Sequence, residues 1–188
     1  MANKEVIIIG GSAGSINVVL KILPLLKNEI KLPLILVLHR KAGEENILES
    51  LLQFKSKLKV TEVMDKMPVE NNVVYLAPAN YHLLIEKEKI FMLDDSEKVN
   101  YSRPNIDVTM ESAIEVYHEK VIGILLTGAN NDGAAGLKKI KEAGGITIIQ
   151  SPETCLFPNM PQYAAELCKP NFSMTPEEIA QYIINLKN

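Results

Sequence analysis

EVIIIGGSAGSINVVLKIL, residues 5–23, joins a run of branched apolar residues to an amphipathic stretch through a short glycine-rich turn. Branched apolar residues favour a β-strand, whereas apolar residues three and four positions apart indicate a helix. Ser12 lies in the middle of the turn, whose residues 10–14 read GGSAG. Three interpretations of this turn are open: a serine nucleophile on a sharp turn, a cradle for a phosphate, or a plain connection from strand to helix.

The same strand-to-helix unit recurs along the chain. Continuous apolar runs occur at 5–9, 32–38, 71–78, 121–128 and 145–150. Such runs are typical of parallel strands buried on both faces, because an exposed face would require alternating polar residues. The spacing of apolar residues predicts helices at about 15–23, 44–54, 105–118, 133–142, 160–168 and 176–186. The expected fold is therefore α/β, with a doubly wound, mainly parallel sheet flanked by helices on both faces.

One segment, YHLLIEKEKIFMLDD at 81–95, alternates between apolar and polar residues on each side of a charged turn. This pattern predicts a β-hairpin attached to the sheet near one edge. No repeat, low-complexity tract or linker divides the sequence. Residues 1–188 are therefore expected to form a single domain.

The composition excludes several classes of function. Of 188 residues, 47% are hydrophobic, enough for an ordinary globular core, and the net charge of −3 lacks the cationic excess that nucleic acids and anionic membranes attract. No apolar run is long enough to cross a bilayer and no signal peptide is recognisable, so a cytoplasmic protein is expected. Cys155 and Cys168 have no metal-binding spacing and are expected to be reduced thiols; no metal or cofactor is expected.

Chemistry in an open parallel sheet gathers at the carboxyl ends of its strands. Ser12 follows the first predicted strand, His39 follows the second, and Asp132 lies in the loop TGANNDG after a later strand. The GGSAG turn matches the G-x-S-x-G pattern of a nucleophile elbow. Because a serine needs a base that is oriented by a third group, His39 and Asp132 are the candidates for these two roles.

Each of these residues also has a simpler interpretation. A phosphate cradle fits poorly, because Ser12 occupies the second glycine position of G-x-G-x-x-G and His39 stands where an acid would hold a ribose. Ser12 alone fits a plain turn, His39 alone fits a hydrogen-bonded spacer, and Asp132 alone fits an N-cap of the next helix. The placement of all three at one edge of the sheet favours the catalytic interpretation.

A nucleophile elbow also requires donors for an oxyanion. The helix after Ser12 begins with unpaired backbone N–H groups, so the amide of Ala13 is the first candidate. The second candidate is an amide of Gly128 or Ala129 in the loop that carries Asp132.

Six segments together resemble the catalytic domain of the bacterial chemotaxis protein-glutamate methylesterases, over about residues 5–167. They are the three loops above with NNVVYLAPANYHLLIE, SRPNIDV and ETCLFPNMP. The resemblance implies a doubly wound parallel sheet and hydrolysis of glutamate methyl esters on cytoplasmic chemoreceptor helices, with glutamine deamidation in many members. It implies Ser12 as nucleophile, His39 as base and Asp132 as orienting carboxylate. Arg103, in a matching segment, would either pair with acidic groups near the methylation site or brace its own loop.

The chain departs from the family pattern at several positions. The family usually reads Ser-Thr-Gly-Gly at the elbow and has a methionine in the aspartate loop, where this chain has Ser12-Ala13-Gly14-Ser15 and Ala129. Arg40 also replaces a common methionine. Two hypotheses follow: an active esterase, or a catalytically weakened homologue that binds a receptor or a methyltransferase through the same edge. Because the usual receiver domain is not expected within this chain, a separate receiver protein is another expected partner.

Overall fold

The computed structural model describes residues 4–26, 30–40, 43 and 45–186. At the centre of the molecule lies a seven-stranded sheet in the order β3-β4-β2-β1-β7-β8-β9, in which every neighbouring pair is parallel. The strands are β1 (Val6–Gly11), β2 (Leu34–Leu38), β3 (Lys59–Glu62), β4 (Val73–Leu76), β7 (Val121–Leu125), β8 (Ile146–Gln150) and β9 (Phe172–Met174). The predicted α/β class is confirmed.

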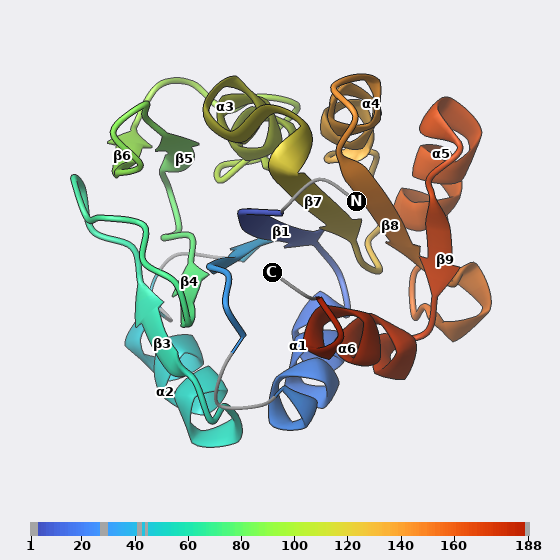
Figure 1. Ribbon diagram of the computed structural model, residues 1–188, viewed down its shortest axis with the longest axis horizontal. Coiled ribbons are helices and arrows are strands. Elements are labelled where there is room, and N and C mark those ends of the chain that lie inside the picture. Colours follow the sequence, from blue (N-terminus) through green and yellow to red (C-terminus); the bar gives the residue numbers. More distant parts are fainter. Residues whose placement is uncertain (1–3, 27–29, 41–42, 44, 187–188) are drawn as a thin grey trace.

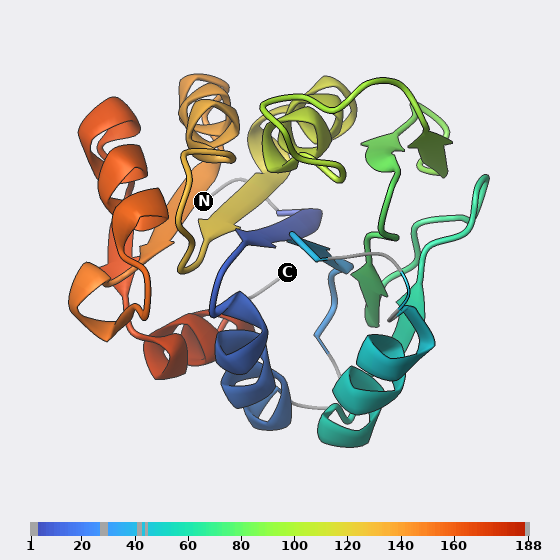
Figure 2. The ribbon, with the colours of Figure 1, turned by 180° about the vertical axis from the view of Figure 1, so that it is seen from behind.

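Helices cover both faces of the sheet (Figure 1, Figure 2). On one face lie α1 (Ser15–Ile22), α2 (Glu45–Lys55) and α6 (Pro176–Ile184), and on the other α3 (Ile106–Tyr117), α4 (Ala134–Glu142) and α5 (Asn159–Cys168). Short 3₁₀ helices span Leu23–Leu25, His118–Lys120 and Pro152–Thr154. The six predicted helices are present, although position 44, where the second was predicted to begin, lies outside the described residues.

The central strand β1 contributes to two separate cores. Ile7 and Ile9 pack into the cluster beneath α1, α2 and α6, whereas Val6 and Ile8 pack into the cluster beneath α3, α4 and α5. All four side chains are almost completely buried, as expected of a strand that is covered on both faces.

The two edge strands were not predicted. β3 (Lys59–Glu62) contains one buried residue, and β9 (Phe172–Met174) is only three residues long and has none. An edge strand is exposed along one side and therefore lacks the continuous apolar run by which the inner strands are recognised.

The predicted hairpin is present, as β5 (His82–Ile85) and β6 (Phe91–Asp94), but it forms a two-stranded sheet of its own and is not hydrogen-bonded to the parallel sheet. The free edge of β5 faces α3. The Thr109 hydroxyl donates to the Leu83 carbonyl at 2.8 Å, and the Ile85 amide donates to the Ser112 hydroxyl at 3.1 Å. Side chains of α3 thus satisfy backbone groups of β5 that a neighbouring strand of the parallel sheet would otherwise have satisfied.

The strand order positions the candidate site. β1 lies between β2 and β7, and the chain crosses to α1 on one face but to α3 and α4 on the other. Loops diverge outside the carboxyl ends of the strands where the order reverses, and they leave a crevice there. Ser12, His39 and Asp132 lie on the loops that follow β1, β2 and β7. Among the described residues, no helix is long and apolar enough to span a membrane.

Candidate active site

The turn at residues 10–14 carries Ser12 from the end of β1 to the start of α1. Gly10 is needed for close packing, because a Cβ there would lie 2.4 Å from the Ile106 side chain at the start of α3. Gly14 is needed for conformation, because its φ of 81° is in the left-handed region. The turn thus brings Ser12 close to the N-terminus of α3, a helix far away in the sequence.

The backbone of Ser12 is fixed from two sides. The Ser12 amide donates to the Thr127 carbonyl at 3.0 Å, which ties the turn to the end of β7. The Ser12 carbonyl accepts both the amide of Ser15, at 3.0 Å, and the Ser15 hydroxyl, at 2.6 Å. Ser15, which stands where the family usually has glycine, therefore adds a hydrogen bond to the turn.

His39 connects the serine to the carboxylate. The Nδ1 atom lies 3.2 Å from the Ser12 hydroxyl oxygen, and the Nε2 atom lies 2.8 Å from Oδ2 of Asp132. Because an ionised carboxylate only accepts hydrogen bonds, Nε2 carries the ring proton and Nδ1 presents its lone pair to Ser12. The ring is reversed relative to chymotrypsin, where Nδ1 faces the aspartate, but the two nitrogen roles are the same.

Asp132 is buried, with 4% of its surface exposed. Besides His39, its carboxylate accepts the backbone amides of Ile106, at 2.8 Å, and Asp107, at 3.1 Å, which are the first two residues of α3. The interpretation of Asp132 as an N-cap of its own next helix is wrong, because the N-cap of α4 is Gly133, with φ 88°, and no side chain caps the helix there. Asp132 instead lies at the positive end of α3, where a negative charge is stabilised.

Asn130 is a site residue that the sequence analysis did not assign. Its Nδ2 lies 3.3 Å from Nδ1 of His39, and its Oδ1 accepts the amide of Asp132 at 3.2 Å. Asn130 stands where the family usually has glycine, but it is absent from the residues with positive φ, so the loop is not strained by the replacement. The signal that could have found it is its position two residues before Asp132.

The candidate oxyanion donors differ in availability. The Gly128 amide donates to the Phe157 carbonyl at 3.0 Å, so the expectation that Gly128 supplies an oxyanion donor is not met. Gly128 is needed for space instead, since a Cβ there would lie 3.0 Å from that of Ser12. Within the described part of the chain, the amides of Ala13 and Ala129 donate to no protein acceptor and remain the candidate donors.

The two arginines near His39 are both held by protein groups. The Arg103 guanidinium donates to the carbonyls of Asp95 and Ser96, which is the loop-bracing arrangement. Arg40 is nearly buried and pairs with Glu62. Both arginines line a pocket of about 310 Å³ beside His39, together with Asn80, Lys98, Tyr101 and Ser102.

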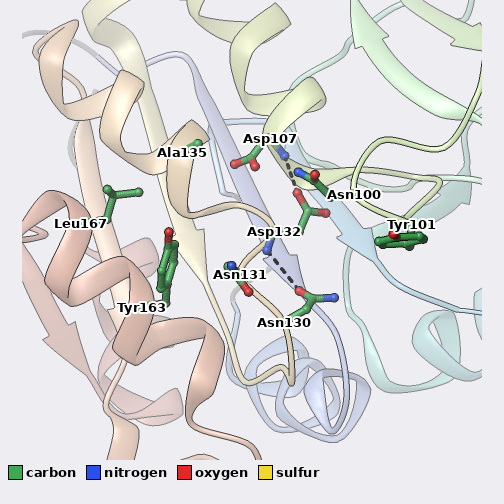
Figure 3. Close-up of a pocket in the computed structure, with 9 residues that line it drawn as sticks. All are labelled: Asn100, Tyr101, Asp107, Asn130, Asn131, Asp132, Ala135, Tyr163 and Leu167. Atoms are coloured by element: carbon green, nitrogen blue, oxygen red, sulfur yellow. Dashed lines mark hydrogen bonds between the residues drawn. The ribbon is translucent and has the colours of Figure 1, made fainter.

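A second pocket, of about 410 Å³, opens beside Asp132 (Figure 3). Tyr101 lines both pockets, is 97% exposed and has a φ of 63°, an unfavourable conformation for a bulky residue. Asp107 faces this second pocket, and burial, opposed by a hydrogen bond from Gly136 and reinforced by the charge of Asp132, raises the pKa of Asp107 to about 6.

The environments of Cys155, Cys168 and His82 fit structural roles and not catalysis or metal binding. Cys155 and Cys168 are both free, and burial raises the pKa of Cys155 to about 11, so its thiolate is scarce at neutral pH. His82 is buried, and its Nε2 lies 3.1 Å from the Glu97 carbonyl, which indicates a structural role. In the ranges that the structure describes, no three His, Cys, Asp or Glu residues are grouped as metal ligands.

Comparison with known proteins agrees with this geometry. Residues 7–183 match the family described as CheB methylesterase. A Leptospira interrogans protein, provisionally named protein-glutamate methylesterase/protein-glutamine glutaminase, is 45% identical over 98% of this chain and 95% of its own length. A protein-glutamate methylesterase/protein-glutamine glutaminase of Archaeoglobus fulgidus is 35% identical over 94% of this chain and 53% of its own length. The crystal structure of the Thermotoga maritima CheB methylesterase catalytic domain matches with a TM-score of 0.94 at 32% identity, covering 99% of this chain and all of that one.

Proposed function

The chain belongs to the CheB methylesterase family, and from this membership we propose that it is a serine hydrolase of glutamate methyl esters on chemoreceptors or related signalling proteins. The observation that carries the proposal is the continuous contact from Ser12 through His39 to Asp132. A catalytically weakened binding module would have no need of a His39 ring aligned between both partners. We propose that the chain is a single catalytic unit and that it acts in the cytoplasm, where the substrate helices lie.

In the first step, the Ser12 oxygen attacks the ester carbonyl and the Ser12 proton moves to Nδ1 of His39. Asp132 accepts the Nε2 proton of the ring in a hydrogen bond and stabilises the imidazolium that forms. The carbonyl oxygen becomes an oxyanion, for which the amides of Ala13 and Ala129 are the proposed donors. The C–O bond to the methoxy group then breaks, and methanol leaves with the proton from Nδ1.

In the second step, water attacks the acyl-enzyme while Nδ1 of His39 takes one of its protons. The C–O bond to Ser12 breaks, the proton returns to the Ser12 oxygen, and a free glutamate remains on the substrate protein. A glutamine side chain would follow the same steps with ammonia as the leaving group, which supports deamidation as a second activity of this site. The replacements at Ala13 and Ala129 leave both proposed backbone donors in place.

A fluorophosphonate probe tests the proposed nucleophile. Such probes phosphonylate serines that are activated by a neighbouring base, with loss of fluoride, so a single covalent adduct is expected on the tryptic peptide that contains Ser12. As the probe concentration rises, labelling of Ser12 should increase and methanol release from methylated receptor membranes should decline in proportion. An unlabelled Ser12 in an active preparation, or full methanol release from labelled protein, would overturn the proposal.

The substrate side of the proposal rests on the pocket beside His39, where Lys98 is exposed and has no ion pair among the described residues. We expect Lys98 to attract acidic residues that neighbour the methylated glutamate. Lys98→Gln should raise KM about threefold to fivefold at low salt with kcat unchanged, and the difference should disappear at high salt, because exposed charges are screened. Lys57→Gln, which removes a lysine outside both pockets, is the matched control. Equal KM values for wild type and Lys98→Gln at low salt would remove this part of the proposal.

A further inference from the structure

Each of the helices α3 and α4 is capped at its N-terminus by a carboxylate from the other helix or from the loop before it, and we call this arrangement an exchange of caps. Asp132 precedes α4 in the chain, yet it accepts the first two backbone amides of α3. Asp107, the second residue of α3, in turn accepts the amide of Gly136 in α4 at 2.6 Å. Asp132, which precedes α4, therefore caps α3, and Asp107, which belongs to α3, caps α4.

This exchange satisfies amides that have no partner within their own helices. In α3, the third amide, of Val108, is accepted by the side chain of the N-cap Asn105, and the first two are accepted by Asp132. In α4, the N-cap is a glycine without a side chain, so Asp107 replaces the missing cap for Gly136. A Cβ on Gly136 would lie 3.2 Å from the Asp107 Cα and 2.8 Å from the Met110 Cβ, so the glycine allows this approach.

The charge of Asp107 opposes folding. The pKa of Asp107 rises from 3.8 to about 6 in the folded protein, so the folded state binds its proton more tightly than the unfolded chain does. The free energy of unfolding therefore falls as the pH rises from about 4 to about 6. An asparagine would offer the same oxygen to the Gly136 amide without this charge, so helix capping alone does not account for a carboxylate at this position.

Several titratable groups surround Asp107. Asp132 faces it from the loop before α4, and Glu111 lies one turn further along α3, where it pairs with Lys139 of α4 at 2.7 Å. Tyr101 and Tyr163 face the same pocket from the loop before α3 and from α5 (Figure 3). The charge of Asp107 therefore acts mainly on the catalytic carboxylate and its loop, because Lys139 partly neutralises the charge of Glu111.

We propose that Asp107 is a positioning residue for the esterase reaction: its ionised carboxylate ties α4 to α3, fixes the loop that carries Asp132, and adds negative charge behind the His39–Asp132 pair. This inference rests on the proposed function. A charge-assisted hydrogen bond to Gly136 holds the loop more firmly than a neutral one. The second negative charge favours the imidazolium form of His39, which forms when the Ser12 proton moves to Nδ1.

The test compares Asp107→Asn and Asp107→Ala with wild type across pH. Asp107→Asn retains an acceptor for Gly136 and should lower kcat about fivefold at about pH 8, with KM unchanged. Because Asp107 of the wild type is itself protonated in acid, the ratio of the two kcat values should fall from about five to about one near pH 5. Asp107→Ala, which also removes the acceptor, should lower kcat about 10-fold to 100-fold by misplacing the loop.

The control removes a helix cap on the opposite face of the sheet. In Thr175→Ala, α6 loses the side chain that accepts the Glu178 amide at 3.2 Å, so the melting temperature should fall while kcat is retained. Asp107→Asn should instead show a higher melting temperature than wild type at neutral pH, with a smaller difference near pH 4. A kcat ratio for Asp107→Asn that is close to one, or independent of pH, overturns this inference. An active Ser12→Ala variant would instead overturn the proposed function, so the two failures are distinguishable.

Discussion

Ser12→Ala is expected to lower kcat for methanol release by about 10⁶-fold, the loss seen when a serine hydrolase is deprived of its nucleophile. The reason is that the described residues offer no other activated nucleophile to form the acyl-enzyme. Within the described residues, the Ser12 hydroxyl is the oxygen that Nδ1 of His39 approaches at 3.2 Å, and the nearby Cys155 thiol has its pKa raised to about 11 by burial. Release from methylated receptor membranes by the variant should therefore approach the background.

The same substitution should leave the fold intact. The backbone bonds of the turn, from Ser12 to Thr127 and Ser15, do not involve the Ser12 hydroxyl. The free energy of unfolding should therefore change by less than about 0.5 kcal/mol. Cys155→Ser is the matched control, because it changes a nucleophilic side chain close to the site and should retain wild-type kcat. Methanol release by folded Ser12→Ala at a rate near that of wild type would exclude the serine mechanism.

The inner part of the fold and the proximity of Ser12, His39 and Asp132 could be predicted from the sequence because both depend on local signals. β1, β2 and β7 are continuous apolar runs, and each is followed directly by the loop that carries Ser12, His39 or Asp132. The rule that parallel strands present their carboxyl ends at one edge then brings the three residues together. No contact had to be known for this step.

The features that could not be predicted depend on contacts between distant segments. The role of Gly128 was misjudged because its amide finds the carbonyl of Phe157, a partner about thirty residues away that no local pattern announces. The hairpin was expected on the sheet, but Thr109 and Ser112 of α3 satisfy its edge instead. Asp132 was predicted to contact His39, and it does, yet the helix that it caps is α3 and not the adjacent α4. The sequence pattern indicates which groups need partners but not which distant groups supply them.

Asp132→Asn is expected to lower kcat about 10⁴-fold, because the asparagine amide cannot reproduce the acceptors of the carboxylate. Oδ2 of Asp132 accepts both His39 Nε2 and the Ile106 amide, and Oδ1 accepts the Asp107 amide. If the asparagine NH₂ group takes the position of Oδ2, it faces two donors, Nε2–H of His39 and the Ile106 amide. The proton of the His39 ring must then move to Nδ1. Nδ1 then no longer accepts the Ser12 proton.

If the asparagine oxygen takes the position of Oδ2 instead, the NH₂ group faces the amide of Asp107, and this buried donor loses its acceptor. Either orientation should therefore lower the free energy of unfolding by about 1–3 kcal/mol in addition to the loss of activity. ¹⁵N NMR of His39 separates the two cases, since a proton on Nδ1 marks the first orientation. Asp65→Asn, which changes a carboxylate that accepts the Leu93 amide outside the candidate site, is the matched control and should retain kcat. A folded Asp132→Asn variant that carries the His39 proton on Nδ1 and yet keeps kcat within tenfold of wild type would show that the carboxylate stabilises the N-terminus of α3 without orienting His39.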